Sequence, residues 1–61
     1  MAELLDLRQS AKELNVSIHT IRAWTYQKRI PFVRLGRRVL LRREDLEEFV
    51  NRNVIEAKER P

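Results

Sequence analysis

Residues 11–24 read AKELNVSIHTIRAW, and this stretch contains the junction between two predicted helices. Asn15 tolerates the left-handed backbone conformation with which many helices end. Ser17 is one of the residues favoured directly before a helix, where its hydroxyl accepts a backbone hydrogen bond. Only Asn15 and Val16 therefore separate the first helix from the cap of the second. A connection this short forces the two helices to cross steeply, and Val16 is placed to fill the corner between them.

The first helix is predicted to span residues 7–14. Leu7, Ala11 and Leu14 recur at helical spacing and share one face. Asp6 precedes this run and Gln9 follows three residues later, which is the pattern of a capping box. The sequence thus defines both ends of a short helix with one apolar face.

The second helix is predicted to span residues 18–27 and to have two different faces. The apolar face consists of Ile18, Ile21, Trp24 and Thr25. The opposite face mixes small, polar and planar side chains, namely His19, Thr20, Ala23, Tyr26 and Gln27, with Arg22 on its flank. A helix that buries one face and presents the other in this way can enter the major groove of DNA.

A hairpin and a third helix are predicted beyond Pro31. Residues 32–41 alternate apolar and charged side chains around Gly36, which favours two strands joined by a tight turn. The third helix is expected to start near Glu44, because acidic residues crowd its first turns and suit the helix dipole. Its predicted inner face consists of Leu46, Phe49, Val50, Val54 and Ala57.

These elements predict an α+β fold that is mostly helical. The architecture is a winged helix-turn-helix, with three helices and a two-stranded hairpin wing between the second and the third. The 61 residues are enough for one domain. We expect a single domain over residues 1–61 with a core at about 4–52, followed at 54–61 by a helix extension or a frayed tail.

The charge is concentrated in one part of the chain. Residues 17–43 contain eight basic side chains and no acidic one, and the net charge of the whole chain is +4. Seven of the eight are arginines, whose planar donors match phosphates and guanine edges. A polyanion, and above all nucleic acid, is the partner that this block favours. A solvated basic face and an anionic membrane surface remain the alternatives.

Several other classes of protein are disfavoured. The chain has no cysteine and one histidine, so we expect no metal site and no cofactor. No apolar run approaches the roughly 20 residues of a membrane span, so a cytoplasmic location without membrane contact is the expectation. A chain this small rarely supplies a catalytic pocket with its supporting shell, and it has no Gly-rich phosphate loop, so we expect no enzyme.

The order of these elements carries a resemblance to a known family. The words that carry it are AKELNVS at 11–17, TIRAW at 20–24, IPFVRLGRR at 30–38 and REDLEEF at 43–49. Over about residues 4–52 the chain resembles the excisionase family of small winged helix-turn-helix proteins, which is related to the DNA-binding domains of mercury-resistance-type (MerR-type) regulators. Two positions depart from the family pattern, which often has Gly where this chain has Lys28 and an apolar or aromatic residue where it has Arg22.

The resemblance implies double-stranded DNA as the partner, with the second helix in the major groove and the hairpin at the minor groove or backbone. The predicted contacts of the recognition helix are Ser17, His19, Thr20, Arg22, Ala23 and Tyr26. The predicted contacts of the wing are Arg34, Arg37 and Arg38. The predicted contacts to the DNA backbone are Lys28, Arg29, Arg42 and Arg43.

Some of these assignments have structural alternatives. Arg22 can pair with an acid of the first helix such as Glu13, His19 can be merely exposed, and Tyr26 can cover the edge of the core. Arg42 and Arg43 can pair with nearby acids instead of DNA, namely Glu44, Glu47 or Glu48. Trp24 is expected in the core, although it can also stack on a base.

Within DNA binding, the resemblance favours an excisionase-like recombination directionality factor. Cooperative self-association on DNA and a recombinase (integrase) partner belong to that prediction. A small transcriptional regulator and the DNA-binding domain of a phage terminase small subunit are the alternatives within the fold. Outside DNA binding, the alternative is a protein-interaction adaptor that uses the third helix and Ile55. RNA has less support, because no exposed aromatic platform is evident.

Overall fold

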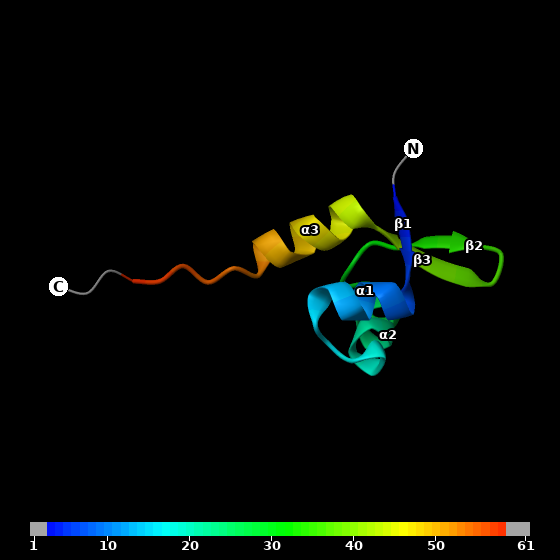
Figure 1. Ribbon diagram of the computed structural model, residues 1–61, viewed down its shortest axis with the longest axis horizontal. Coiled ribbons are helices and arrows are strands. Elements are labelled where there is room, and N and C mark those ends of the chain that lie inside the picture. Colours follow the sequence, from blue (N-terminus) through cyan, green and yellow to red (C-terminus); the bar gives the residue numbers. More distant parts are fainter. Residues whose placement is uncertain (1–2, 59–61) are drawn as a thin grey trace.

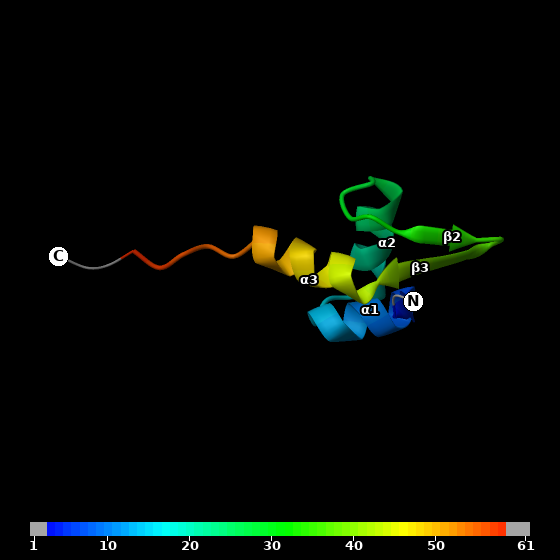
Figure 2. The same cartoon turned by 90° about the horizontal axis from the view of Figure 1, so that it is seen from above.

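A computed structural model describes residues 3–58 of the chain, and Figure 1 shows its three helices and three strands. In chain order they are β1 (Leu4–Asp6), α1 (Leu7–Leu14), α2 (Ile18–Tyr26), β2 (Val33–Leu35), β3 (Arg38–Arg42) and α3 (Arg43–Arg52). The order of helices and hairpin confirms the winged helix-turn-helix prediction. Seen from above, α2 lies on the β2 side of the sheet and α1 on the β1 side (Figure 2).

The sheet has three strands, whereas two were predicted. Its order is β1-β3-β2, and both pairs are antiparallel. Leu5 of β1 lies opposite Leu41 of β3, so both side chains point to the core face of the sheet. The sequence analysis missed β1 because a strand of three residues is too short to show an alternating pattern.

The core lies where the sheet meets the helices. Its buried cluster consists of Leu5, Ile30, Leu41 and Leu46. Trp24 and Phe49 pack against this cluster, and their ring centroids are 5.0 Å apart, within the range of favourable aromatic pairs. The prediction that Trp24 belongs to the core is therefore confirmed.

The helix caps follow the sequence signals closely. The Asp6 carboxylate accepts from the backbone N–H of Gln9 at 2.7 Å, and the Gln9 side chain accepts from the N–H of Asp6 at 2.9 Å. The Ser17 hydroxyl accepts from the N–H of Thr20 at 3.2 Å. Asn15 has a φ of 56°, the left-handed conformation predicted for the end of the first helix.

The predicted boundaries of two helices each differ from the structure by one residue, and one predicted helix face was wrong. The second helix ends at Tyr26, one residue before the predicted position, and α3 begins at Arg43, one residue earlier than predicted. The larger error concerns the inner face of α3, because this helix ends at Arg52 and leaves Val54 and Ala57 exposed beyond it. The apolar spacing continues past Arg52, but residues 55–58 extend away from the other elements (Figure 1).

Candidate nucleic-acid interface

One stripe of α2 faces solvent and carries four of the predicted DNA contacts. His19, Arg22, Ala23 and Tyr26 stand at positions i, i+3, i+4 and i+7, which is one face of a helix. His19 and Arg22 are exposed, Ala23 is half-buried, and Tyr26 is 89% exposed. The alternative that Tyr26 covers the edge of the core does not match this exposure.

The opposite face of α2 fixes the orientation of that stripe. Ile21 is fully buried, and the Thr25 hydroxyl is satisfied by donating to the backbone carbonyl of Arg22 at 2.9 Å. Because the inner face is held by the core, the outer stripe cannot rotate away from solvent. The two remaining predicted contacts of the helix, Ser17 and Thr20, lie at its start, where their hydroxyls hydrogen-bond each other at 3.0 Å.

The chain reverses sharply after α2 around Lys28. The N–H of Arg29 donates to the carbonyl of Trp24 at 2.8 Å, and the N–H of Lys28 donates to that of Thr25 at 3.0 Å. This pair of bonds is the Schellman arrangement, which puts its left-handed residue where Gly is usual. Lys28 occupies that position with a φ of 57°. The turn therefore displays the Lys28 and Arg29 side chains, both exposed, at the end of α2.

The wing, which we define as residues 33–42, is a hairpin with a two-residue turn. Leu35 pairs with Arg38, so the connection consists of Gly36 and Arg37. Gly36 has a φ of 61° whereas Arg37 has no positive φ, the combination found in type II′ hairpin turns.

Arg34 and Arg38 lie on opposite faces of the wing. Arg34 lies opposite Val39, which shares the core face of the sheet with Leu41. Arg38 stands one residue away from Val39 and so lies on the other face, together with Leu35. The sequence analysis grouped these arginines as one set, but DNA on a single side of the wing can meet only one of the two directly.

The last two arginines of the basic block have carboxylate partners within the chain. Arg42 binds the carboxylate of Asp45 through two bonds of 2.7 and 3.1 Å. Arg43 binds Glu3 at 2.7 Å and Glu13 at 3.3 Å. The sequence analysis considered pairing as the alternative for both arginines, but the acids that it named, Glu44, Glu47 and Glu48, are not the partners.

These ion pairs shift the titration of the groups involved. The hydrogen bond to Arg43, helped by charge attraction, lowers the pKa of Glu3 below its ordinary value. The hydrogen bonds and charges of Glu3 and Glu13 raise the pKa of Arg43, and the hydrogen bond and charge of Asp45 raise that of Arg42. Both guanidinium groups are thus committed to neighbouring carboxylates.

The remaining cations of the basic block are unpaired. Within residues 3–58, no carboxylate lies within ion-pair distance of the six exposed side chains Arg22, Lys28, Arg29, Arg34, Arg37 and Arg38. The alternative in which Arg22 pairs with Glu13 is wrong, because Glu13 pairs with Arg43. All six side chains belong to α2, the turn after it and the wing. The fold thus places uncompensated positive charge on α2, on the turn after it and on the wing.

Other kinds of site are not apparent in the described part of the chain. Residues 3–58 contain no group of three acidic, His or Cys side chains arranged to hold a metal ion. Among these residues, no helix has the length and apolar character needed to cross a membrane.

Comparison with known proteins gives two matches. The sequence profile of a family described as "Helix-turn-helix domain" matches residues 4–54. The transcriptional repressor DcmR of Methylorubrum extorquens (strain DSM 6343 / CIP 106787 / DM4) is 47% identical over 51 residues, which cover 80% of this chain and 19% of that protein. The chain therefore spans about a fifth of the length of this relative. No solved structure matches the chain.

Proposed function

Because the chain belongs to the helix-turn-helix domain family, we propose that it binds double-stranded DNA with the outer stripe of α2 in the major groove. The observation that carries this proposal is the group of six exposed, unpaired cations on α2, the turn after it and the wing. An α-helix with its side chains is about 10–12 Å across, which suits the roughly 12 Å width of the major groove. The family and the relative both point to a DNA-binding regulator and not to an enzyme.

The residues divide into two roles in this proposal. His19, Arg22, Ala23 and Tyr26 contact base edges, because they occupy the outward stripe of α2. Ser17 and Thr20, at the first turn of α2, contact a phosphate there.

The cations beside α2 contact the DNA backbone or the minor groove. They are Lys28, Arg29 and Arg37, together with whichever of Arg34 and Arg38 lies on the face of the wing that meets DNA. Arg42 and Arg43 are left out of the proposed contacts, because Asp45, Glu3 and Glu13 already engage their guanidinium groups.

The process served is proposed to be control of transcription. Its support is the repressor that is 47% identical to the matched part of the chain. An excisionase-like role with a recombinase partner, and membership of the MerR-type branch, rest on the resemblance of short sequence words alone. Cooperative self-association on DNA rests on that same resemblance.

The proposal is tested by selecting bound sequences from a random DNA pool and measuring the affinity of the selected site at several salt concentrations. Enrichment of a short motif and a steep fall of affinity with salt are expected, since each phosphate contact adds about 0.9 to the slope. If nothing is enriched at low salt, the outer stripe of α2 does not read DNA.

A matched pair of variants locates the wing contacts. Arg37→Ala with Arg38→Ala removes two positive charges from the wing, and Arg8→Ala with Lys12→Ala removes two from the exposed surface of α1. The wing variant should lower the salt slope by about two units if Arg38 faces DNA and by about one unit if only Arg37 does, whereas the α1 variant should leave it nearly unchanged. Equal effects of the two variants would mean that net charge, not the wing, attracts DNA.

Single variants then distinguish contacts to base edges from contacts to the DNA backbone. Arg22→Ala and His19→Ala should change the selected sequence, each good base contact being worth roughly 1–3 kcal/mol. An equal loss of affinity on every sequence would reassign them to the backbone. Arg34→Ala and Arg38→Ala, compared singly, identify which face of the wing meets DNA, because the two side chains lie on opposite faces.

A further inference from the structure

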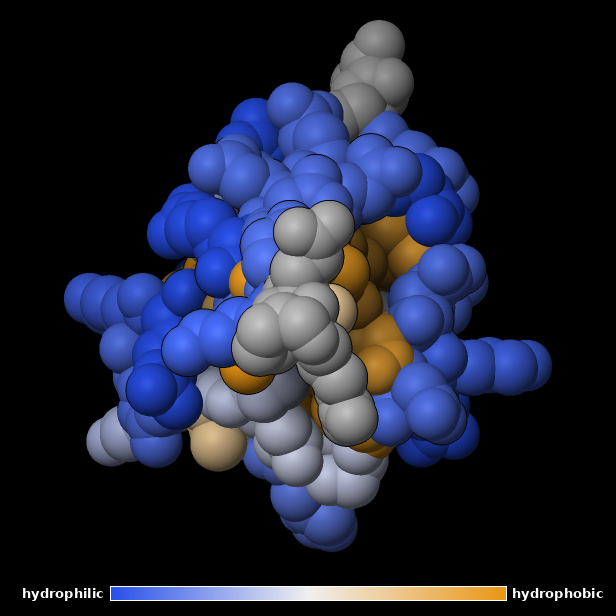
Figure 3. Space-filling model, turned by 90° about the vertical axis from the view of Figure 1, so that its left-hand side faces the viewer, coloured by the Kyte–Doolittle hydropathy of each residue, from blue (hydrophilic) through white to orange (hydrophobic). Residues whose placement is uncertain are grey.

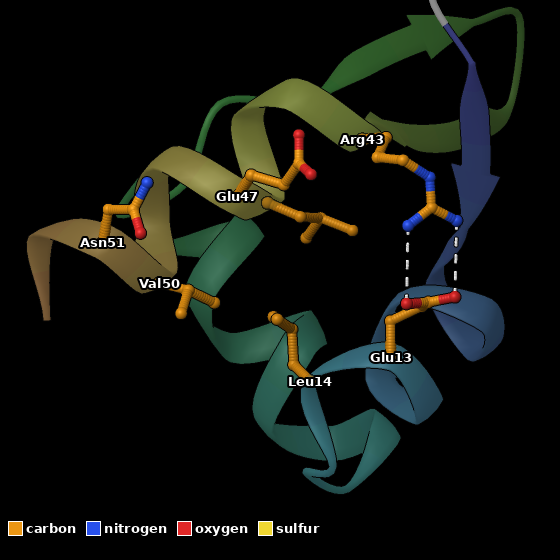
Figure 4. A pocket seen from close by; sticks show the side chains of 7 residues that line it. Glu13, Leu14, Arg43, Glu47, Val50 and Asn51 are labelled. Carbon is orange, nitrogen blue, oxygen red and sulfur yellow. Dashed lines mark hydrogen bonds and ion pairs between the residues drawn. The ribbon is translucent and has the colours of Figure 1, made fainter. Parts of the chain in front are cut away.

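An open apolar groove lies between α3 and the tip of the α1–α2 pair. Two adjoining hollows form it, and they share Leu14 and Val50. The other apolar side chains that line this groove are Val16, Trp24, Leu46, Phe49 and Val54. Figure 3 shows apolar surface in a hollow beside the point where the chain leaves α3, and Figure 4 shows Leu14 and Val50 pointing into it. Val50 is 46% exposed although it lies between apolar neighbours.

The rim of this groove is acidic toward the start of α3. Glu13 and Glu47 both line it, and Glu44 is exposed one turn away on the same helix. Glu13 is paired with Arg43, as Figure 4 shows. Within residues 3–58, no cation lies within ion-pair distance of Glu47 or Glu44. An occupant of the groove therefore gains from a positive charge at this end.

The segment that follows α3 carries an exposed apolar side chain and, at its far end, a positive charge. We define residues 54–58, with sequence VIEAK, as the tail. Ile55 is 93% exposed, so a large apolar side chain stands in water beside an unfilled apolar groove. The tail has one acidic residue, Glu56, and one basic residue, Lys58, so its positive charge lies at its far end, three residues beyond Ile55.

The tail does not fold back into the groove of its own molecule. Asn53 has a φ of −103°, so the chain does not make the left-handed reversal that follows α1 at Asn15 and α2 at Lys28. The tail continues away from α3 in both ribbon views (Figures 1 and 2). Val54 itself lines the groove, and a β-branched residue resists the positive φ that a reversal at this point requires.

We propose that a second copy of this chain fills the groove, with its tail antiparallel to α3 and its Ile55 against Leu14 and Val50. The contact is reciprocal, because each copy offers the same groove and the same tail to the other. It does not involve the outer stripe of α2 or the wing, so DNA binding and self-association use different surfaces.

The dimensions and the charges agree with this arrangement. Three extended residues, from Ile55 to Lys58, span about 10 Å. The same distance along a helix corresponds to about seven residues, which leads from Val50 to the first turn of α3. Lys58 of one copy thus reaches the unpaired carboxylates of Glu44 and Glu47 in the other, whereas a parallel arrangement would carry it away from them.

Sedimentation of the whole chain without DNA, over a range of concentrations, tests the association. Ile55→Asp should weaken it at least about tenfold, because the apolar contact is lost twice in a reciprocal dimer. Its control is Leu35→Asp, at a wing residue that is 54% exposed and outside the groove, which should leave the association unchanged. Concentration-independent monomer, or equal effects of the two substitutions, would overturn the proposal.

A charge exchange tests the antiparallel direction. Lys58→Glu and Glu47→Lys should each weaken the association about twofold to fivefold, as exposed ion pairs do. The double variant should recover most of the loss, because it restores the pair with its signs exchanged. Additive losses in the double variant would overturn the proposed direction.

A spin label distinguishes a second copy from a tail folded back on its own chain. The chain has no cysteine, so Ala57→Cys gives one attachment site. Copies at natural isotope abundance carry the spin label, and they are mixed with ¹⁵N-labelled copies that lack it. Broadening of the Leu14 amide and the Trp24 indole signals in the ¹⁵N copies supports the dimer. Broadening only when both labels are in one molecule, or none at all, overturns it. Because DNA is absent throughout, these results leave the proposed DNA binding untouched.

Discussion

Lys28 occupies a backbone conformation that suits glycine, and replacing it should stabilise the protein. Its φ of 57° belongs to the left-handed region, where an L-residue with a side chain costs about 1–2 kcal/mol. Gly removes that cost but gains freedom in the unfolded chain, which offsets about 0.5–1 kcal/mol. The net gain expected for Lys28→Gly is therefore roughly 0.5–1 kcal/mol.

Lys28→Ala is the matched control, because it removes the same charge and retains the strained backbone. The Gly variant should unfold at a temperature about 2–8 °C above that of the Ala variant, since 1 kcal/mol shifts Tm by about 4–8 °C in a domain of this size. Circular dichroism during heating and urea titration both measure the difference. Equal midpoints for the two variants would refute the reasoning that strain is stored at this turn.

DNA affinity measured on the same pair separates backbone strain from charge. Both variants lose the Lys28 ammonium, so both should lose the same phosphate contact and the same part of the salt slope. For stability, Asn15→Gly provides a second comparison. Its gain in the free energy of unfolding should be smaller than that of Lys28→Gly, because Asn tolerates the left-handed region better than Lys. A difference in affinity between the two Lys28 variants would show that the turn positions α2 in addition to carrying charge.

Three other substitutions, the first with a matched control, test the scaffold. Leu41→Ala should lower the free energy of unfolding in urea by about 2–5 kcal/mol, whereas Leu35→Ala, at an exposed position, should change it by well under that amount. Gly36→Ala has room for its methyl group but keeps a φ of 61°, so it should cost about 1 kcal/mol through the backbone alone; an unchanged midpoint would show that the turn relaxes. Because Arg43 lowers the pKa of Glu3, their pairing stabilises the fold above the ordinary Glu pKa of about 4.3 and is lost as the pH falls through the lowered value. Tm measured against pH should therefore fall less steeply in Glu3→Gln, and superimposable profiles would contradict that link.

The features that the sequence predicted well are those that depend on near neighbours. The capping box joins Asp6 to Gln9, and the cap of α2 joins Ser17 to Thr20, each across three residues. Gly36 directs the hairpin turn through its own φ. The residues that specify such a feature lie within a few positions of it in the sequence, so no knowledge of tertiary contacts is needed to predict it.

The errors arise where a distant partner decides the outcome. β1 is a strand only because β3 lies beside it, and its three residues carry no pattern of their own. The apolar spacing of α3 continues to Val54 and Ala57, but the helix ends at Arg52 and the chain beyond Val54 extends away from the other elements (Figure 1). Local propensity describes what a segment can form, and tertiary contact decides how much of it forms.

The division of the basic block has the same cause and bears directly on function. Sequence proximity suggested Glu44, Glu47 and Glu48 as partners for its last arginines. Pairing of β1 with β3 instead brings the distant residue Glu3 beside Arg43. Because its partners come from β1 and α1, Arg43 joins both elements to the start of α3. A block that looks uniform in the sequence thus separates into six unpaired cations and two that hold the scaffold together, so the charge of the block overstates the interface by at least two contacts.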